Sequence, residues 1–321
     1  MIYPDNFEQK TEFDIIREMI RDKCLSEQGK KYAEKIGFTS DIELLEKWLD
    51  QTAEFKQLLA DHPDFPQQDY FDLRPELERI RIPGSHMDPE KLFDLKTSLS
   101  TILDVSAYFN KARKESIPTL REISDQVTVE KAIPARIEKL MDERGQIRDG
   151  ASETLKKIRK NIRGKLSAAD RQIYQTLKSA KQSGWVAPDA EVTIRDGRPV
   201  IPLPVTHKRR IRGFILDESA SGQTVYIEPG EVMVINNEIR ELKSAERREI
   251  INILKDLSDF LRPHIPDLTE AYRLTGLIDF IRAKALIAAR IHGIKPVMHS
   301  HPLIDWKKGM HPLLYLHHQK I

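Results

Sequence analysis

The fold is decided by residues 191–229, whose sequence is EVTIRDGRPVIPLPVTHKRRIRGFILDESASGQTVYIEP. This is the only clearly β-rich region of the chain, because its hydrophobic residues alternate or cluster in four short runs typical of strands. The runs are Val192–Ile194, Val200–Ile201, Arg212–Leu216 and Thr224–Ile227. Asp196-Gly197 is a tight-turn dipeptide, because glycine accepts a positive φ. The first two strands are therefore predicted to form a hairpin.

The second strand contains Pro199, Pro202 and Pro204. Proline has no N–H to donate to a central ladder, so this strand is predicted to be short and to lie at an edge. The polar loop Glu218–Gln223 joins the last two strands. A unit of about four short strands buries little core by itself, so the sequence predicts a support for it.

The flanks of this β unit predict that support. Hydrophobic residues recur at helical spacing from Ser152, a good N-cap, to Ser183-Gly184, and again from Pro229-Gly230 to Pro263. Each run has about 30 residues, which is roughly 45 Å of helix. We therefore expect two long antiparallel helices with the β unit at their tip.

The same region concentrates positive charge. Fifteen lysines and arginines between Lys156 and Arg212 face four acids, a net charge near +11, whereas the whole chain carries +2. The remainder of the chain is therefore near −9. One concentrated positive arm is the electrostatic pattern expected of a protein that binds polyanions. The alternative is that the basic helix faces are simply solvated.

Composition limits the class of protein. The 321 residues are 40% hydrophobic and 32% charged, which is typical of a soluble, helix-biased chain. The sequence has no run of about 18 apolar residues, and its start, MIYPDNFEQK, lacks a signal-peptide core, so we expect no membrane partner and a cytoplasmic location. The single cysteine, Cys24, excludes an intrachain disulfide and a cysteine-rich zinc site.

Residues 1–140 have the pattern of ordinary helical packing. One amphipathic face starts at Phe13 and is predicted to end near Gly29, a second begins after Ser40-Asp41, and a third is opened by Asp88-Pro89. Residues 142–150 are predicted to be a turn or short hairpin. After Pro263, a helix from Thr269 is predicted to return to this core.

Several of these segments carry a resemblance. The run VTIRDGRPVIPLPVTHKRRIRGFILDESASGQTVYIEP, with Val234-Ile-Asn-Asn-Glu238 and Arg247-Arg248-Glu249-Ile250 after it, resembles the second bacterial branch of the MutS family. Lys10-Thr-Glu-Phe-Asp14 and Asp142-Glu-Arg-Gly-Gln-Ile-Arg-Asp-Gly-Ala-Ser152 are similar to the same branch. This branch lacks the mismatch-reading domain and is associated with branched DNA, suppression of recombination and rescue of stalled ribosomes.

The resemblance implies a mainly α fold: a helical core domain whose two long antiparallel lever helices carry a small β-rich clamp. The expected divisions are a helical core (1–140), a connector with the first lever helix (141–190), the clamp (191–229), the second lever helix with its return to the core (230–290), and a lead-in to an ATPase domain (291–321). In such proteins the clamp closes around DNA.

The clamp supplies the candidate nucleic-acid-binding residues, which are Arg195, Arg198, Lys208, Arg209, Arg210, Arg212, Ser219 and Ser221. The basic side chains are expected to meet phosphates, and backbone amides near the serines add hydrogen bonds, so that shape and not base sequence is recognised. Two alternatives stay open. The serines merely build a tight loop, or Arg198 forms a salt bridge with Glu191 or Asp196.

We assign no catalytic residues and no cofactor to this chain. A phosphate-binding Gly-x-x-x-x-Gly-Lys-Ser/Thr motif is absent from the sequence, since Gly164-Lys165-Leu166 lacks both the first glycine and the hydroxyl residue. ATP and magnesium are expected in the missing ATPase domain, and the wedge of mismatch readers and the nuclease domain of this branch are not found. We therefore favour a fragment of a longer protein over a naturally short relative.

Two further groups are candidate chemical sites. Five histidines near the end, His299, His301, His311, His317 and His318, are compatible with zinc but lack a matched carboxylate or thiolate, so no metal site is predicted. Cys24 lies beside Lys23, which would lower its pKa, but a lone helical thiol is more often inert packing.

Two functions remain open. The first is a nucleic-acid clamp that grips branched or structured duplex DNA, or ribosomal RNA, within a longer protein that is a homodimer. The second is a structural spacer and dimerisation scaffold without direct nucleic-acid contact.

Overall fold

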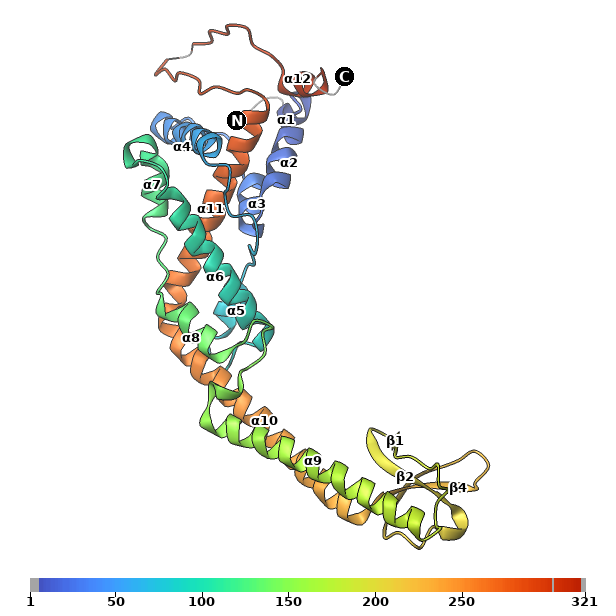
Figure 1. Ribbon diagram of the computed structural model, residues 1–321. Helices are drawn as coiled ribbons and strands as arrows, with labels where there is room; N and C mark the ends of the chain where they lie inside the picture. Colours follow the sequence, from blue (N-terminus) through green and yellow to red (C-terminus); the bar gives the residue numbers. More distant parts are fainter. Residues whose placement is uncertain (1–5, 302, 319–321) are drawn as a thin grey trace. The chain divides into compact units, whose positions relative to one another are not determined.

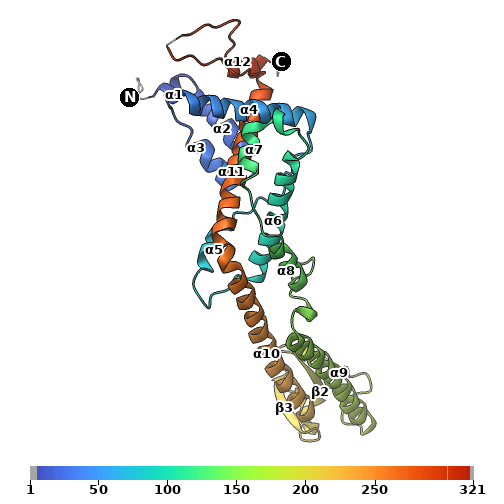
Figure 2. The same cartoon turned by 90° about the vertical axis from the view of Figure 1, so that its left-hand side faces the viewer.

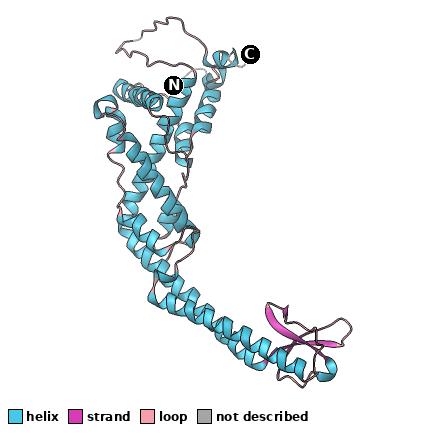
Figure 3. Ribbon diagram, in the orientation of Figure 1, coloured by secondary structure: helices cyan, strands magenta, loops and turns pink. Residues whose placement is uncertain are grey.

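The computed structural model describes residues 6–301 and 303–318, and these divide into two compact units. Unit 1 contains the described residues up to Gln146 and from Lys255 onward, and unit 2 contains Ile147–Leu254. The fold is mainly α, with one small antiparallel sheet that lies in unit 2 (Figure 3), as the sequence predicts. Within the described residues, no helix is long and apolar enough to cross a membrane.

Unit 1 is built from short and medium helices around one long helix. Their bounds are α1 Phe7–Lys10, α2 Phe13–Lys23, α3 Glu27–Glu34, α4 Ile42–Asp61, α5 Arg74–Arg79, α6 Pro89–Phe109, α7 Pro118–Ser124, α8 Ala132–Leu140, α11 Ile265–Arg290 and α12 Pro312–His318. Asp41 caps α4 by accepting a hydrogen bond from the Leu44 N–H at 3.1 Å, and Pro89 opens α6, both as predicted. The predicted turn at residues 142–150 is confirmed in part by the Asp142 carboxylate, which accepts the N–H groups of Arg144 and Gln146.

The long helix α11 is the centre of unit 1 (Figure 2). Fourteen of its 26 residues are buried, and it contacts α2 to α7. Leu274, Ile278 and Ile281 join the main core cluster with Phe55 of α4 and Tyr108 of α6. α11 begins at Ile265 and not at the predicted Thr269, because a proline in the first helical turn loses no hydrogen bond.

A buried ion pair on α11 fixes the corner between α2 and α3. Asp279 Oδ2 accepts the N–H groups of Leu25 and Ser26 at 2.8 and 2.7 Å, and Arg282 donates to Asp279 and to the Lys23 carbonyl. The carboxylate therefore meets the start of α3, and the guanidinium meets the end of α2, where each is favoured by the helix dipole.

The prediction that the first amphipathic helix ends near Gly29 is wrong. α2 ends at Lys23, and Gly29 lies buried inside α3, where an added Cβ would stand 2.5 Å from Asp279 Oδ2. Gly29 therefore allows close packing against α11 instead of ending a helix.

Unit 2 contains most of the two long helices that the sequence predicts. α9 spans Glu153–Gln182 and is capped by Ser152, whose Oγ accepts the Leu155 N–H at 2.9 Å. α10 spans Gly230–Leu261, and the division between the units falls within it, after Leu254. A 3-10 turn at Arg262–His264 follows, in agreement with the predicted break at Pro263.

Side-chain pairs show that α9 and α10 run antiparallel along each other in unit 2 (Figure 1). In successive pairs the residue number on the α9 side increases while the residue number on the α10 side decreases. The four pairs are Ser152–Glu249 at 2.6 Å, Arg159–Glu246 at 2.7 Å, Lys165–Glu238 and Gln172–Glu231. The pairing of the two helices is thus an observed feature of unit 2.

The sheet has four antiparallel strands in the order β1-β2-β4-β3. Their bounds are β1 Thr193–Arg195, β2 Arg198–Pro204, β3 Gly213–Glu218 and β4 Thr224–Pro229. Asp196 and Gly197 both have positive φ, 48° and 72°, and join β1 to β2 in the predicted hairpin.

The prediction that the proline-containing strand is short and at an edge is wrong. β2 is the longest strand, and it lies between β1 and β4. However, β1 pairs only with residues 198–200 and β4 only with residues 201–204, so each half of β2 has a single partner. This split pairing leaves one side of every proline outside a ladder, which is why the strand tolerates them.

One face of the sheet packs on the helices. Ile201, Leu203, Val225 and Ile227 form a core cluster with residues of α9 and α10, including Ile173, Leu177 and Val232. At the end of the sheet, Gly213 is needed because a Cβ there would stand 2.2 Å from the Glu228 carbonyl oxygen. The predicted support of the β unit by its two flanking helices is therefore a shared core.

Candidate nucleic-acid interface

The basic residues between β2 and β3 lie on a loop that is fixed at both ends. At its start the Val205 N–H donates to the Gln223 carbonyl at 2.9 Å, and at its end the Arg212 carbonyl accepts the Gly230 N–H at 2.9 Å. Between these points the Arg210 N–H donates to the His207 carbonyl at 2.8 Å, and the Ile211 side chain is buried in the core of unit 2. We call residues 205–212 the basic loop.

The basic loop presents four exposed cations, Lys208, Arg209, Arg210 and Arg212. Among the described residues, none of the four forms an ion pair. Because Ile211 anchors the loop, the backbone that carries these cations is held in place, and their charges are not neutralised within the described chain. A fixed group of solvated cations is suited to meet a phosphate backbone.

Arg195 has partners within the sheet. Its Nε lies 3.0 Å from Asp217 of β3, and its guanidinium lies over the ring of Tyr226 at 4.1 Å from the centroid. Its side chain is 37% exposed, so it retains a solvated edge. Its predicted role in binding phosphate stays a prediction, but it is already engaged in holding β1 to the rest of the sheet.

Arg198 is bound more firmly. Its Nη1 donates to Glu228 at 2.8 Å, and the other Glu228 oxygen accepts from Asn236 of α10 at 2.7 Å. Glu228 is fully buried, so removing Arg198 would leave a carboxylate in the interior. The alternative of a salt bridge is therefore the arrangement observed, although with Glu228 and not with Glu191 or Asp196.

Ser219 and Ser221 lie in the loop between β3 and β4. The Ser219 hydroxyl accepts the Thr224 N–H at 3.1 Å and lies 3.4 Å from the Ser221 hydroxyl, while Gly222, with φ of 67°, closes the turn on the Ser219 carbonyl. These contacts are those of the loop-building alternative. A contact between either serine and nucleic acid remains a prediction.

The long helix α9 and the sheet contribute less free charge than the sequence indicates. Six of the fifteen predicted cations are in ion pairs: Lys156, Arg159, Arg163, Lys165, Arg195 and Arg198. Unit 2 as a whole has 20 bases and 14 acids, a net charge of +6, and the rest of the chain has 32 bases and 36 acids, or −4. The missed signal was the acids outside the counted segment, of which Glu238 and Glu246 of α10 pair with α9, and Asp217 and Glu228 pair with the arginines of the sheet.

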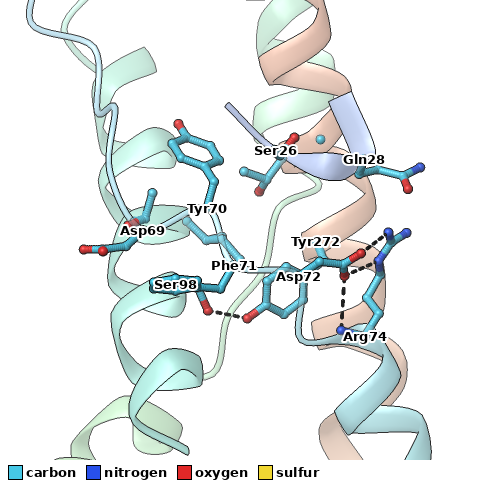
Figure 4. A pocket seen from close by; sticks show the side chains of 13 residues that line it. Ser26, Gln28, Asp69, Tyr70, Phe71, Asp72, Arg74, Ser98 and Tyr272 are labelled. Carbon is cyan, nitrogen blue, oxygen red and sulfur yellow. Dashed lines mark hydrogen bonds and ion pairs between the residues drawn. The ribbon is translucent and has the colours of Figure 1, made fainter. Parts of the chain in front are cut away.

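Unit 1 contains a small cavity that is lined by polar and aromatic side chains (Figure 4). Its volume is about 20 Å³, room for about one water molecule. The Ser98 and Tyr272 hydroxyls bind each other at its wall, and Asp72 pairs with Arg74 at 2.7 Å. Within the described residues, the buried Thr275 hydroxyl has no hydrogen-bond partner. The cavity is too small for a substrate.

The remaining chemical candidates are a metal site and the Cys24 thiol. Within the described residues, no group of three or more histidine, cysteine or acidic side chains is arranged to hold a metal ion. Burial, together with the nearby Asp279 carboxylate, raises the pKa of Cys24 to about 12. The option of a lowered thiol pKa is therefore wrong, because the thiol is shielded from water. Of the predicted lead-in, residues 302 and 319–321 lie outside the described residues.

Comparison with known proteins extends the resemblance over almost the whole chain. The chain is 29% identical to Endonuclease MutS2 of Alkaliphilus oremlandii over 304 residues, 30% identical to that of Geobacillus sp. over 305, and 31% identical to that of Finegoldia magna over 305. Each match covers 94% of this chain. The chain is similar to MutS2 proteins. A scan against models of protein families finds no match.

The MutS2 matches cover only part of each relative. This chain spans 38–39% of their length. The matches support the predicted resemblance to the second MutS branch. The activity of the whole relatives belongs to proteins more than twice as long.

Proposed function

We propose that this chain is the core, lever and clamp portion of a MutS2-like protein and that it binds structured nucleic acid through unit 2. In this proposal α9 and α10 are the lever helices and the sheet is the clamp. The observation that carries the proposal is the basic loop, whose four exposed cations have no ion-pair partners in the described chain. Nothing in the fold favours the alternative of a spacer without nucleic-acid contact.

Branched or otherwise structured duplex DNA is the proposed client. The relatives are named endonucleases, which act on nucleic acid, and the cations available here meet backbone and not base edges. Ribosomal RNA presents the same phosphate chemistry, so ribosome binding is an outcome of the test. ATP hydrolysis with magnesium, a nuclease step and homodimerisation are proposed for the longer protein and not for the residues described above.

A comparative binding experiment tests the proposal. Fluorescence anisotropy would be measured with a four-way junction, a plain duplex and a single strand of equal phosphate number, and ribosomes would compete at matched ionic strength. We expect affinity to fall steeply with salt, because each neutralised phosphate releases counterions. We also expect tighter binding of the junction than of the duplex. Equal, salt-insensitive or absent binding of all probes would overturn the proposal.

A further inference from the structure

Unit 2 contains a groove that shares Arg210 and Arg212 with the basic loop and adds an aromatic wall to them. Four segments line it: α9 with Thr176 and Ser179, the turn after α9 with Trp185, the basic loop with residues 210–212, and the junction of β4 and α10 at residues 229–231. Its volume is about 440 Å³. This is within the range of small-ligand sites.

Trp185 is held at the wall of this groove. Gly184 turns the chain after α9 with a φ of 68°, and the Trp185 N–H donates to the Ala180 carbonyl at 2.9 Å. The indole is half-buried and packs partly against the core of unit 2. A flat aromatic face that is fixed in position and still lines an open groove is suited to stacking on a planar ring.

Arg210 and Arg212 supply the charge in the same groove. Both side chains are exposed, and within the described residues neither has an ion-pair partner. A guanidinium binds phosphate through two parallel hydrogen bonds and can also stack on a base. An aromatic wall beside two arginines therefore matches the two parts of a nucleotide, the base and its phosphate.

Glu231 is the one acid in the groove. Its carboxylate accepts a hydrogen bond from Gln172 of α9. This charge disfavours phosphate close to α10, whereas the arginines favour it at the basic loop. Phosphate is therefore expected at the two arginines, and the base is expected to stack on Trp185.

We propose that this groove binds a single unpaired nucleotide of a nucleic-acid strand. The inference rests on the proposed function and adds a preference to it. A base inside a duplex has both faces stacked and cannot reach an aromatic side chain, so only an unpaired or displaced nucleotide can enter. The basic loop then binds backbone of any form, and the groove favours structures with unpaired nucleotides.

Tryptophan fluorescence gives the first test. In a Trp48→Phe/Trp306→Phe variant, Trp185 is the remaining tryptophan of the chain. Titration with a short oligothymidylate is expected to quench its emission saturably, and an equal concentration of inorganic phosphate is expected to leave it unchanged. Quenching by neither, or by both to the same extent, would contradict stacking in the groove.

Binding of matched probes gives the second test. The probes are a duplex, the same duplex with a three-nucleotide bulge, and that bulge without bases, each made in DNA and RNA. Trp185→Leu keeps an apolar side chain against the core and is expected to weaken binding of the bulged probe by about tenfold or more, with less than about twofold change for the duplex. Trp185→Phe is expected to restore part of the loss, and the baseless bulge should bind like the duplex.

The outcomes separate this inference from the proposed function. If the duplex binds and Trp185→Leu leaves the bulged probe unaffected, the groove does not bind a nucleotide, although the basic loop still functions. If no probe binds to the wild-type chain, the proposed function itself fails. Should Trp185→Leu fail to fold, the fluorescence titration and the binding of the bulged and baseless probes to Trp185→Phe decide the question.

Discussion

Arginine has opposite roles in the two units. Arg282 in unit 1 is 5% exposed and bound to Asp279 at 2.9 Å and to the Lys23 carbonyl. Its charge therefore stabilises the packing of α2, α3 and α11. Arg209, Arg210 and Arg212 in unit 2 are exposed and have no ion-pair partner in the described chain. The same side chain therefore stabilises a fold in one place and remains available to a partner in the other.

This difference shows that a count of charges in the sequence overstates the available charge. The segment with a predicted net charge near +11 lies in a unit of +6, because the rest of that unit is acidic, above all in the strands β3 and β4 with Asp217, Glu218 and Glu228. Of the nine cations in this segment without an ion pair in the described chain, five are spread along α9, and four lie within the eight residues of the basic loop. Mutations in the two regions should therefore affect different measurements.

The largest effect on stability is expected for Asp279→Ala. Arg282 and the N–H groups of Leu25 and Ser26 would lose their acceptor in the interior, which should cost about 3–5 kcal/mol of unfolding free energy. Urea denaturation followed by circular dichroism measures this loss.

Glu270→Ala is the matched control for Asp279→Ala. Glu270 pairs with Arg273 on the same helix and at the same spacing, but both side chains are more than 40% exposed. The expected cost is at most about 1 kcal/mol. Equal costs for the two variants would show that the buried pair does not hold the corner of α2 and α3.

A smaller loss is expected for Gly213→Ala in unit 2. The new Cβ would stand 2.2 Å from the Glu228 carbonyl oxygen, so the pairing of β3 with β4 must shift, at about 1–3 kcal/mol. Hydrogen exchange of the β3 and β4 amides is expected to accelerate.

Gly164→Ala in the same unit is expected to raise the free energy of unfolding, whereas Gly213→Ala is expected to lower it. Gly164 lies inside α9, and a Cβ there has no atom within 4 Å. Alanine is therefore expected to stabilise the helix by about 0.5–1 kcal/mol. If Gly213→Ala leaves exchange in the sheet unchanged, the close approach of β3 to β4 is not required.

The sequence predicted the elements of unit 2 well because each has a strong local signal. Ser152 as an N-cap, Asp196-Gly197 as a turn and the stop at Ser183-Gly184 are each decided by a few neighbouring residues. By contrast, the position of β2 depends on which strands pair with it, and the role of Gly29 depends on Asp279, 250 positions away. Such contacts have no signature in the local sequence.

The candidate site was predicted in part for the same reason. Exposure of the four cations of the basic loop follows from a polar, turn-like stretch. The engagement of Arg198 with Glu228 and the placement of Trp185 beside Arg212 depend on the packing of sheet and helices. Trp185 was missed altogether, although an aromatic residue just after a helix end, near a basic segment, was a weak signal.

Lys284 of α11 is expected to reduce stability at neutral pH. Burial beside the ring of Phe280 lowers the pKa of Lys284 to about 8. Below about pH 8, Lys284 is protonated in both the folded and the unfolded state, and folding includes the full cost of removing its charge from water. Between about pH 8 and pH 10 only the unfolded chain keeps the proton, so the stability of the wild-type protein rises with pH. Lys284→Met is expected to stabilise by about 1–2 kcal/mol at pH 7, with the gap closing above about pH 10.

Thermal unfolding at several pH values measures this effect, with Lys31→Met, at an exposed position, as the control. A gap between Lys284→Met and wild type that stays constant with pH would contradict a titrating buried lysine.

The smallest effect concerns Cys24, which should be unreactive in the folded state. Its side chain is 6% exposed and its pKa is raised to about 12, so little thiolate exists at pH 8. A coloured disulfide reagent should label the folded chain far more slowly than the chain in guanidinium. Because the folded state holds this proton more tightly, stability is also expected to decline as pH rises from about 9 toward 12. Rapid labelling of the folded protein would contradict the burial.

The central claim is tested most directly by the salt dependence of DNA binding. The slope of log affinity against log salt would be compared for wild type, for Lys208→Glu/Arg209→Glu/Arg210→Glu, and for Lys10→Glu/Lys35→Glu/Lys139→Glu, which makes the same charge change at exposed positions in unit 1. If the basic loop meets phosphates, the first triple variant should lower the slope by about two to three and the second should leave it unchanged. Equal slopes for all three proteins would contradict the claim.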